Sequence, residues 1–286
     1  MILDKNSRDF TLSKYAKLCE NLKDLGYKFL TFEEYFNSTP SEKIVLMRHD
    51  IDNVVDHKIC LRMAKIEKDL GVKSTYYTRV IPKVFNLKTL NYIKLQGHEI
   101  GYHYEVLNLA KGSRNLALSL FKKQLSFLRQ FFNIQTICQH GGLLGNDTAS
   151  TFQGLLNVLI KRMDENRKIQ IYDSRSLWES NDFNELDIIG DAYLSLDYND
   201  FKYFSDTGLA WNNFNSRLLD KVDTDLQVGS NVKTTDNLIE HIKRFKHKKV
   251  SILVHPANWI EPLHSWLQWH LLQLFRNGGK RYGVSN

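Results

Sequence analysis

The sequence has few cysteines and prolines, and it contains no low-complexity segment. Its three cysteines, Cys19, Cys60 and Cys138, are an odd number, widely spaced and without a paired-cysteine motif. This arrangement favours reduced thiols over a disulfide framework or a structural zinc site. The four prolines are scattered, and neither a Gly/Ser-rich linker nor an internal repeat is present. With 286 residues, of which 42% are hydrophobic, the chain is long enough for one large domain.

Long apolar runs are also absent. No stretch approaches the ~18 apolar residues that a membrane-spanning helix needs. Residues 1–18 carry charges throughout and lack the continuous apolar segment of a secretory signal. We therefore expect a soluble, cytoplasmic protein without a membrane span. The sequence does not indicate an oligomeric state.

Positive charge exceeds negative charge in this chain. The formal net charge is +7. A cluster of cations lies late in the sequence, at Lys243, Arg244, Lys246, Lys248 and Lys249. These residues close a helical pattern at residues 236–245, where cations complement the carboxyl end of a helix and stay solvated. We therefore expect no nucleic-acid partner, whereas attraction of an anionic substrate such as a nucleotide-linked sugar is compatible with the charge.

Strand-like and helix-like segments alternate along most of the chain. Apolar or β-branched runs predict strands at residues 43–50, 73–80, 98–103, 135–140 and 250–254. Amphipathic periodicity predicts helices at residues 12–25, 55–70, 87–96, 116–132, 237–245, with Thr235 as its cap, and 261–276. Short strands are expected among irregular loops at residues 169–172, 187–189 and 202–204. This alternation predicts an α/β fold with a parallel sheet and helical crossovers, either open or closed into a barrel.

Polar residues that bind metals or move protons follow four of the predicted strands. The segments are RHDID at residues 48–52, GHEIGYHYE at 97–105, CQHGG at 138–142 and ILVHP at 252–256. The carboxyl ends of parallel strands open onto one side of a sheet, where the active sites of such folds are built. Asp50 and Asp52 are two residues apart and share one face of their strand. Together, these segments offer the aspartate and histidine ligands of a catalytic divalent metal, with a further carboxylate and histidine as base and acid.

In this order, the segments resemble those of the NodB-type polysaccharide deacetylases, the carbohydrate esterase 4 superfamily. RHDID stands where that family has its paired-aspartate motif, in the form seen in the deformylase-like and surface-polysaccharide branches. GHEIGYH resembles the family's GHEIGxH segment, and ILVHP resembles its terminal strand with a histidine. The resemblance implies a distorted (β/α) barrel of about seven parallel strands. The expected organisation is a helical extension at residues 1–40 packed on a barrel domain at residues 41–286.

The resemblance also implies roles for individual residues. Asp52 and His103 would bind the metal, Asp50 would be the general base, and His255 would be the general acid. The sequence permits the reverse assignment of Asp50 and Asp52, because both side chains face one way. The expected cofactor is a divalent metal, with zinc as the first choice.

The chain departs from the family's pattern at two points. The family's second histidine, four residues after the first, is replaced by Leu107, which cannot bind metal. The third ligand is therefore His140, as the first choice, or Glu105, which lies two residues from His103 and shares its face in an extended strand. The family's usual Arg-Pro-Pro-Tyr-Gly is replaced by Gln-His-Gly-Gly. Arg48 is therefore expected to orient the catalytic aspartate in its place.

The implied activity is metal-dependent removal of an N-acyl group, with N-acetyl as the first choice, during surface-polysaccharide synthesis. The substrate would be an amino sugar, a nucleotide-sugar or a lipid-linked glycan. The expected substrate contacts are Arg48, Tyr104, Asp206, Trp211 and Trp259. The aromatic rings would stack on sugars, although such residues are equally common in cores, and the carboxylate would bond a substrate hydroxyl or an active-site residue. Two alternatives stay open, namely an inactive sugar-binding protein on the same scaffold and a different amidase, such as a deformylase.

Overall fold

The computed structural model describes residues 8–38, 40, 42–141, 172–212, 222–226, 228–229 and 231–282. Its strands are β1 (Lys28–Leu30), β2 (Ile44–Ile51), β3 (Thr75–Thr78), β4 (Glu99–Tyr104), β5 (Thr136–Gln139), β6 (Gly190–Asp191), β7 (Phe201–Ser205) and β8 (Lys249–Val254). Its α-helices are α1 (Leu12–Asp24), α2 (Phe32–Phe36), α3 (Asp56–Leu70), α4 (Leu87–Leu95), α5 (Val106–Leu109), α6 (Arg114–Arg129), α8 (Thr235–Phe245) and α9 (Leu263–Tyr282). The short 3₁₀ turns are η3 (Ser174–Glu179), η4 (Phe183–Leu186) and η6 (Pro256–Asn258). Within these described residues, no helix combines the length and the apolar character needed to cross a membrane.

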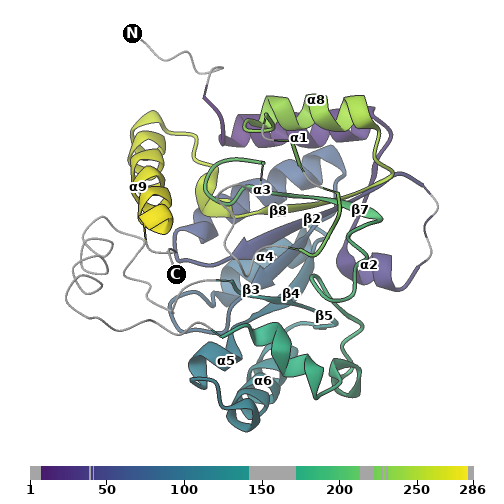
Figure 1. Cartoon of the computed structure of the whole chain (residues 1–286), viewed down its shortest axis with the longest axis vertical. Coiled ribbons are helices and arrows are strands. Elements are labelled where there is room, and N and C mark those ends of the chain that lie inside the picture. Colours follow the sequence, from purple (N-terminus) through teal and green to yellow (C-terminus); the bar gives the residue numbers. More distant parts are fainter. Residues whose placement is uncertain are drawn as a thin grey trace.

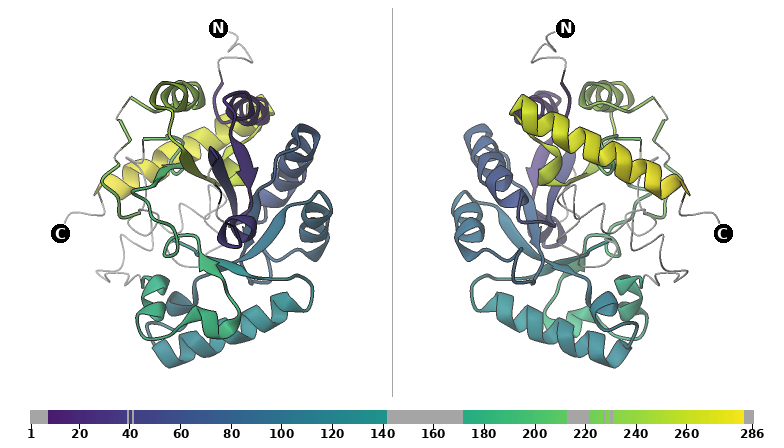
Figure 2. Two further views of the ribbon diagram at one scale, coloured as in Figure 1. Left: turned by 90° about the vertical axis from the view of Figure 1, so that its right-hand side faces the viewer. Right: turned by 90° about the vertical axis from the view of Figure 1, so that its left-hand side faces the viewer.

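The described strands pair only in parallel, in the order β6-β5-β4-β3-β2-β8-β7. β1 pairs with the first half of β2, and β3 pairs with the second half. The sheet curls into an open barrel with helices on its outer side (Figures 1 and 2). This confirms the predicted α/β fold, a distorted (β/α) barrel of parallel strands.

The amino-terminal elements join this fold at two points. β1 extends the sheet at β2, and α1 packs against α3 and α8 on the outer side of the barrel (Figure 1). The division of the chain at residue 40 into an extension and a barrel domain stays a prediction.

Helices begin and end where local side chains satisfy the backbone. Thr11 caps α1 by accepting a hydrogen bond from a backbone amide of the first turn. α3 ends at Gly71, whose φ of 66° suits a residue without a Cβ atom. The cap of α8 is Thr234, not the predicted Thr235, because Thr234 is extended and its hydroxyl accepts from the amide of Asn237.

The middle of the chain differs most from the sequence prediction. The strand predicted at residues 202–204 is confirmed as β7. The strand predicted at residues 187–189 is wrong, because Asp187 adopts a left-handed conformation (φ 55°) after η4 and the strand, β6, begins at Gly190. The strand predicted at residues 169–172 lies outside the described residues except for its last position, which is not in a strand.

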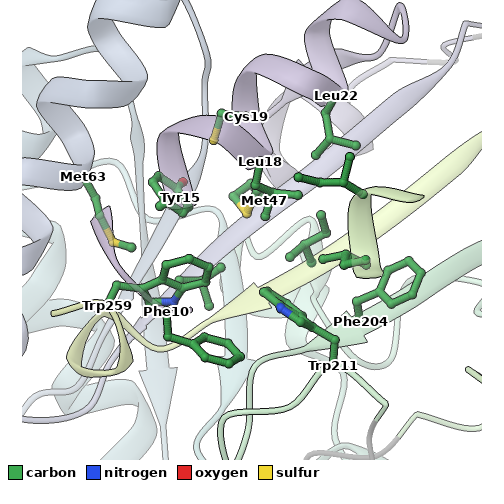
Figure 3. Packing of buried hydrophobic residues seen from close by; sticks show 14 of the residues in the cluster. Phe10, Tyr15, Leu18, Cys19, Leu22, Met47, Met63, Phe204, Trp211 and Trp259 are labelled. Atoms are coloured by element: carbon green, nitrogen blue, oxygen red, sulfur yellow. The ribbon is translucent and has the colours of Figure 1, made fainter. Parts of the chain in front are cut away.

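β2 is buried along its whole length, and its two faces have different surroundings. Met47 packs outward against α1, beside Leu18, as Figure 3 shows. Leu46 packs inside the barrel with residues of neighbouring strands. Because successive side chains of a strand point to opposite faces, Arg48 and Asp50 continue the inner face and His49 points outward.

Inside the barrel, a glycine of β4 leaves room for a tyrosine ring of β3. A Cβ atom on Gly101 would overlap the ring of Tyr77. The Tyr77 hydroxyl donates a hydrogen bond to Thr136 (3.1 Å), so the ring cannot move aside without losing that bond. Tyr77 lies opposite Asp50 in the pairing of β2 and β3, which places this packing directly beneath the polar end of β2.

Gly101→Ala should therefore lower the free energy of unfolding by roughly 3 kcal/mol, because the added methyl group overpacks against the Tyr77 ring. The matched control is Gly26→Ala, at a glycine with φ of 82° and open space around it. At Gly26 the same substitution should lower the free energy of unfolding by only about 1 kcal/mol, which is the cost of placing alanine in a left-handed conformation. Urea unfolding measures both variants. A Gly101→Ala protein as stable as the control would contradict the close packing described.

Candidate metal centre

The polar ends of four strands meet at one edge of the barrel. Asp50 and Asp52 lie at the end of β2. His103 belongs to β4, His140 directly follows β5, and His255 directly follows β8. The order β5-β4-β3-β2-β8 brings these ends together from chain segments that are far apart in sequence.

Asp52, His103 and His140 are close enough to share one cation. Oδ1 of Asp52 lies 3.3 Å from Nε2 of His103 and 3.5 Å from Nε2 of His140. One ligand atom from each residue lies within 4.8 Å of the other two. Oδ1 of Asp52 is buried and has no hydrogen-bond partner among the described residues. A buried carboxylate oxygen that lacks a donor and faces two imidazole nitrogens fits a divalent cation.

Hydrogen bonds hold both of these histidines in the orientation that metal binding requires. Nδ1 of His103 donates to the carbonyl oxygen of Cys138 (3.0 Å), and Nδ1 of His140 donates to Oε2 of Glu105 (3.1 Å). Metal-binding histidines commonly donate one N–H to a carbonyl or carboxylate in this way. Nε2 of each ring is then directed toward Asp52.

The charges of the site depend strongly on one another. Burial alone would raise the pKa of Asp52, but His140, His103 and His255 hold it well below its ordinary value. Burial alone would lower the pKa of His103, but Asp50 and Asp52 raise it. A cation bound between them would replace the proton of His103 as the positive partner of the two carboxylates.

Glu105 supports His140 and does not point at Asp52. Its carboxylate accepts from Nδ1 of His140 and from Nε of Arg79 (3.0 Å), which follows β3. Arg79 also donates from Nη1 to the carbonyl oxygen of Asp52 (2.8 Å). Burial would raise the pKa of Glu105, but His140 and Arg79 lower it to about 2. Of the two alternatives for the third ligand, His140 is therefore the one beside Asp52. The supporting role of Arg79 was not evident from the sequence.

Asp50 lies next to the group formed by Asp52, His103 and His140. One of its carboxylate oxygens has charged neighbours, and the other has no hydrogen-bond partner among the described residues. Oδ2 is 3.3 Å from Nη2 of Arg48 and 3.6 Å from Nε2 of His103. Oδ1 is buried without a hydrogen-bond partner in the described part of the chain. Arg48 is buried as well, and its Nη2 donates to the hydroxyl of Tyr193 (2.6 Å). Arg48 is thus placed to orient Asp50, and its burial does not fit a direct contact with a substrate.

The residues of the site differ in how far they are exposed to solvent. Nε2 of His255 lies 3.9 Å from Oδ2 of Asp52, and both side chains are 20% exposed. The side chains of Asp50 and His103 are only 4% and 2% exposed. A ligand from solvent therefore meets Asp52 and His255 first.

His255 is held by the carboxylate of Asp206. Nδ1 of His255 donates to Oδ1 of Asp206 (2.6 Å), and Oδ2 of the same carboxylate accepts from Nε1 of Trp259 (2.9 Å). Burial alone would lower the pKa of His255, but Asp206 and Asp52 raise it to about 10. His255 therefore carries a proton near neutral pH. Of the two expectations for Asp206, the bond to an active-site residue agrees with the structure, whereas its complete burial does not fit contact with a substrate.

Asp56 joins the two loops that carry Asp52 and His255. Its Oδ2 accepts from the amides of Asp52 (2.8 Å) and Asn53 (2.6 Å), and its Oδ1 accepts from the amide of Ala257 (2.6 Å). Burial and the charge of Asp52 raise the pKa of Asp56 to about 7, although the amides act in the opposite direction. The role of Asp56 could not be predicted from the sequence, because a bridge between positions 201 residues apart leaves no local pattern.

The aromatic residues expected at the substrate lie in the core. Tyr104, Trp211 and Trp259 are fully buried. The Tyr104 hydroxyl donates to Asp191 (2.7 Å), and the two indole rings pack against Phe10 (Figure 3). The expected stacking on sugar rings does not fit these positions, because none of the three rings presents a surface to solvent.

A second polar cluster lies behind the site, on the outer face of β2. Glu67 of α3 is fully buried and accepts from Nε2 of His49 (2.8 Å) and from the hydroxyl of Tyr76 (2.7 Å). The hydroxyl of Tyr15 donates to the same carboxylate, and Nε2 of His98 lies 3.5 Å from it. Burial alone would raise the pKa of Glu67, but His49, His98 and Tyr15 lower it to about 2. This cluster fastens β2 to α1 and α3.

Comparisons with known proteins find distant structural likenesses only. No protein-family model matches the chain, and no curated protein sequence does. A CE4 family pseudoenzyme from Bacillus anthracis is similar over 85% of this chain and 63% of its own, with 11% identity and a TM-score of 0.43. A peptidoglycan deacetylase from Bacillus subtilis is similar over 87% of this chain and 100% of its own, with 13% identity and a TM-score of 0.31. The chain thus spans less than two thirds of the first protein, and at these scores neither likeness carries an argument about function.

The buried cluster predicts how stability depends on pH. Because the pKa of Glu67 falls from 4.5 to about 2 on folding, its ionised form stabilises the protein above pH 4.5, and this contribution is lost as the pH falls toward 2. Glu67→Gln should lower the free energy of unfolding at pH 7 by roughly 3 kcal/mol. The difference in free energy of unfolding between wild type and Glu67→Gln should become smaller as the pH falls from 4.5 to 2.

Urea unfolding of both proteins over this pH range measures the effect. The control is Glu20→Gln, at an exposed position of α1, which should differ from wild type by no more than about 0.5 kcal/mol at any pH. A constant deficit of Glu67→Gln from neutral to acid pH would contradict the pairing of an ionised Glu67.

Proposed function

We propose that the protein is a metal-dependent hydrolase that removes an N-acyl group, most simply N-acetyl, from an amino sugar or a carrier-linked sugar in surface-polysaccharide synthesis. The observation that carries this proposal is the proximity of Asp52, His103 and His140, with Asp50 close to His103 and His255 close to Asp52. Two imidazoles and one carboxylate, with an open side, are the ligand set of a hydrolytic zinc site.

In this proposal Asp52, His103 and His140 hold the cation, and zinc is the proposed metal. When bound, a divalent cation supplies Lewis acidity that favours attack of water on an acyl carbonyl. The assignment of Asp52 as the ligand, with Asp50 as the base, is supported by the position of Asp52 between the Nε2 atoms of His103 and His140.

The remaining residues have roles in proton transfer. Asp50 accepts the proton of the attacking water, and Arg48 holds the Oδ2 atom so that the unpaired Oδ1 is available for it. His255 donates its Nε2 proton to the departing amine. Its pKa of about 10 keeps that proton in place at neutral pH, and Asp206 fixes the ring from the other side.

The choice of substrate rests on the sequence resemblance described above. GHEIGYH and ILVHP resemble motifs of enzymes that act on N-acetylated sugars, and a free amino sugar, a nucleotide-sugar and a lipid-linked glycan all present the same acetamido group. The net charge of +7 favours substrates whose carriers are anionic, such as nucleotide diphosphates.

Removal of a ligand should remove the metal. His103→Ala should abolish stoichiometric zinc binding, because its Nε2 atom faces Asp52 in the centre. Glu105→Gln should weaken zinc binding by about 10–100-fold, because it changes only the group that orients His140. Competition with a chromophoric chelator measures both affinities. His264→Ala, at an exposed histidine of α9, is the control and should bind zinc like wild type. Unchanged zinc affinity in His103→Ala would refute the centre.

Loss of the base or the acid should leave the metal in place. Asp50→Asn and His255→Ala should each bind zinc and release acetate about 10²–10⁴-fold more slowly, because each lacks one proton-transfer group. An enzyme-coupled acetate assay measures kcat on N-acetylglucosamine oligosaccharides and on a nucleotide-linked N-acetyl sugar.

The wild-type protein distinguishes the proposal from its alternatives. If the wild-type protein binds zinc and releases acetate from N-acetylated sugars, the result supports the proposed deacetylase. Zinc with turnover of other amides and no acetate would favour a different amidase. Sugar binding without zinc would favour a sugar-binding protein on the same scaffold.

A further inference from the structure

Cys138 lies beside the metal centre, and the hydrolysis proposed above does not use it. In the pairing of β4 and β5 it stands directly opposite His103. The sulfur of Cys138, a ring nitrogen of His103 and a carboxylate oxygen of Asp50 lie within 4.8 Å of one another. All three residues are buried. They form a second group of potential ligands that overlaps the first only in His103.

An unpaired oxygen independently points to a ligand in this group. Oδ1 of Asp50 is buried and has no hydrogen-bond partner among the residues that the structure describes. The whole residue is 3% exposed, so water does not readily satisfy this atom. A buried carboxylate oxygen without a donor is costly unless a cation or another donor binds it.

The Arg48 guanidinium interacts electrostatically with both Asp50 and Cys138. A cysteine binds metals in its thiolate form. The thiol proton leaves to solvent when a cation takes its place. Arg48 approaches Oδ2 of Asp50, and Oδ1 is the oxygen without a hydrogen-bond partner in the described residues.

The two ligand groups differ in the cations that they prefer. Asp52, His103 and His140 present only oxygen and nitrogen, which suit zinc and harder divalent ions. A thiolate sulfur strongly favours soft cations. Because Nδ1 of His103 is bonded to a carbonyl oxygen, only Nε2 can bind a metal, and it can serve one position at a time.

We propose that Asp50, His103 and Cys138 form an alternative cation position that takes soft divalent ions such as cadmium, in competition with the position at Asp52 and His140. Cadmium bound there engages the carboxylate assigned as the general base. The site itself shares a ligand with the proposed hydrolase centre, but its existence does not depend on the hydrolysis.

Titration of the metal-free, full-length protein with cadmium tests the proposal. The expected result is an ultraviolet thiolate-to-cadmium charge-transfer band, at shorter wavelength than the aromatic absorption, that saturates at stoichiometric metal. Cys138→Ser should lack the band. The double variant Cys19→Ala and Cys60→Ala leaves Cys138 as the only thiol in the chain and should retain the band in full. This variant tests the assignment even where Cys138→Ser does not fold.

His140→Ala separates this site from the hydrolase centre. It should bind zinc at least about 10-fold more weakly, because it lacks one ligand of the first group, while the cadmium band persists. No band in wild type, no band in the double variant, or a band that survives in Cys138→Ser would each overturn the proposal. None of these results depends on acetate release.

Discussion

The charge of Asp52 at the rim of the barrel is the constraint around which the site is arranged. A carboxylate withdrawn from water needs positive charge or hydrogen-bond donors close by. Here His103, His140 and His255 supply them from three other strand ends. Each imidazole has an acceptor behind it, and the acceptor of His140 is itself paired with an arginine. The geometry of the centre and the integrity of this edge of the barrel therefore depend on the same bonds.

The parts of this arrangement that follow from periodicity could be predicted from the sequence. The apolar run at residues 44–47 predicts a buried strand, and the alternation with helices predicts parallel pairing. Parallel pairing alone then requires that RHDID, GHEIGYH and ILVHP end at one edge of the sheet. That Asp52, His103 and His255 also lie close together depends on the strand order β4-β3-β2-β8, which periodicity does not specify.

The third ligand could not be chosen from the sequence, because the choice depends on where a strand ends. Glu105 shares the face of His103 only if β4 continues beyond Tyr104. In the structure β4 ends there, and Glu105 turns (φ −141°, ψ 31°) to begin α5, which directs its carboxylate toward Arg79. Arg79, Asp56 and the core positions of the tryptophans were missed for a related reason. Their contacts join segments that are distant in sequence, and such contacts produce no local period.

β2 is held by different polar groups on its two faces, and this explains why its register is fixed. His49 binds Glu67 behind the strand, whereas Arg48 and Asp50 pair inside the barrel. A slip of one residue would exchange the faces and bring Asp50 to the side of the buried Glu67 carboxylate. The apolar residues at 44–47 would lose little by such a slip, since both faces of that half of the strand are buried among hydrophobic side chains. We infer that the buried polar residues, which are unfavourable to desolvate, specify the register that places Asp52 at the rim.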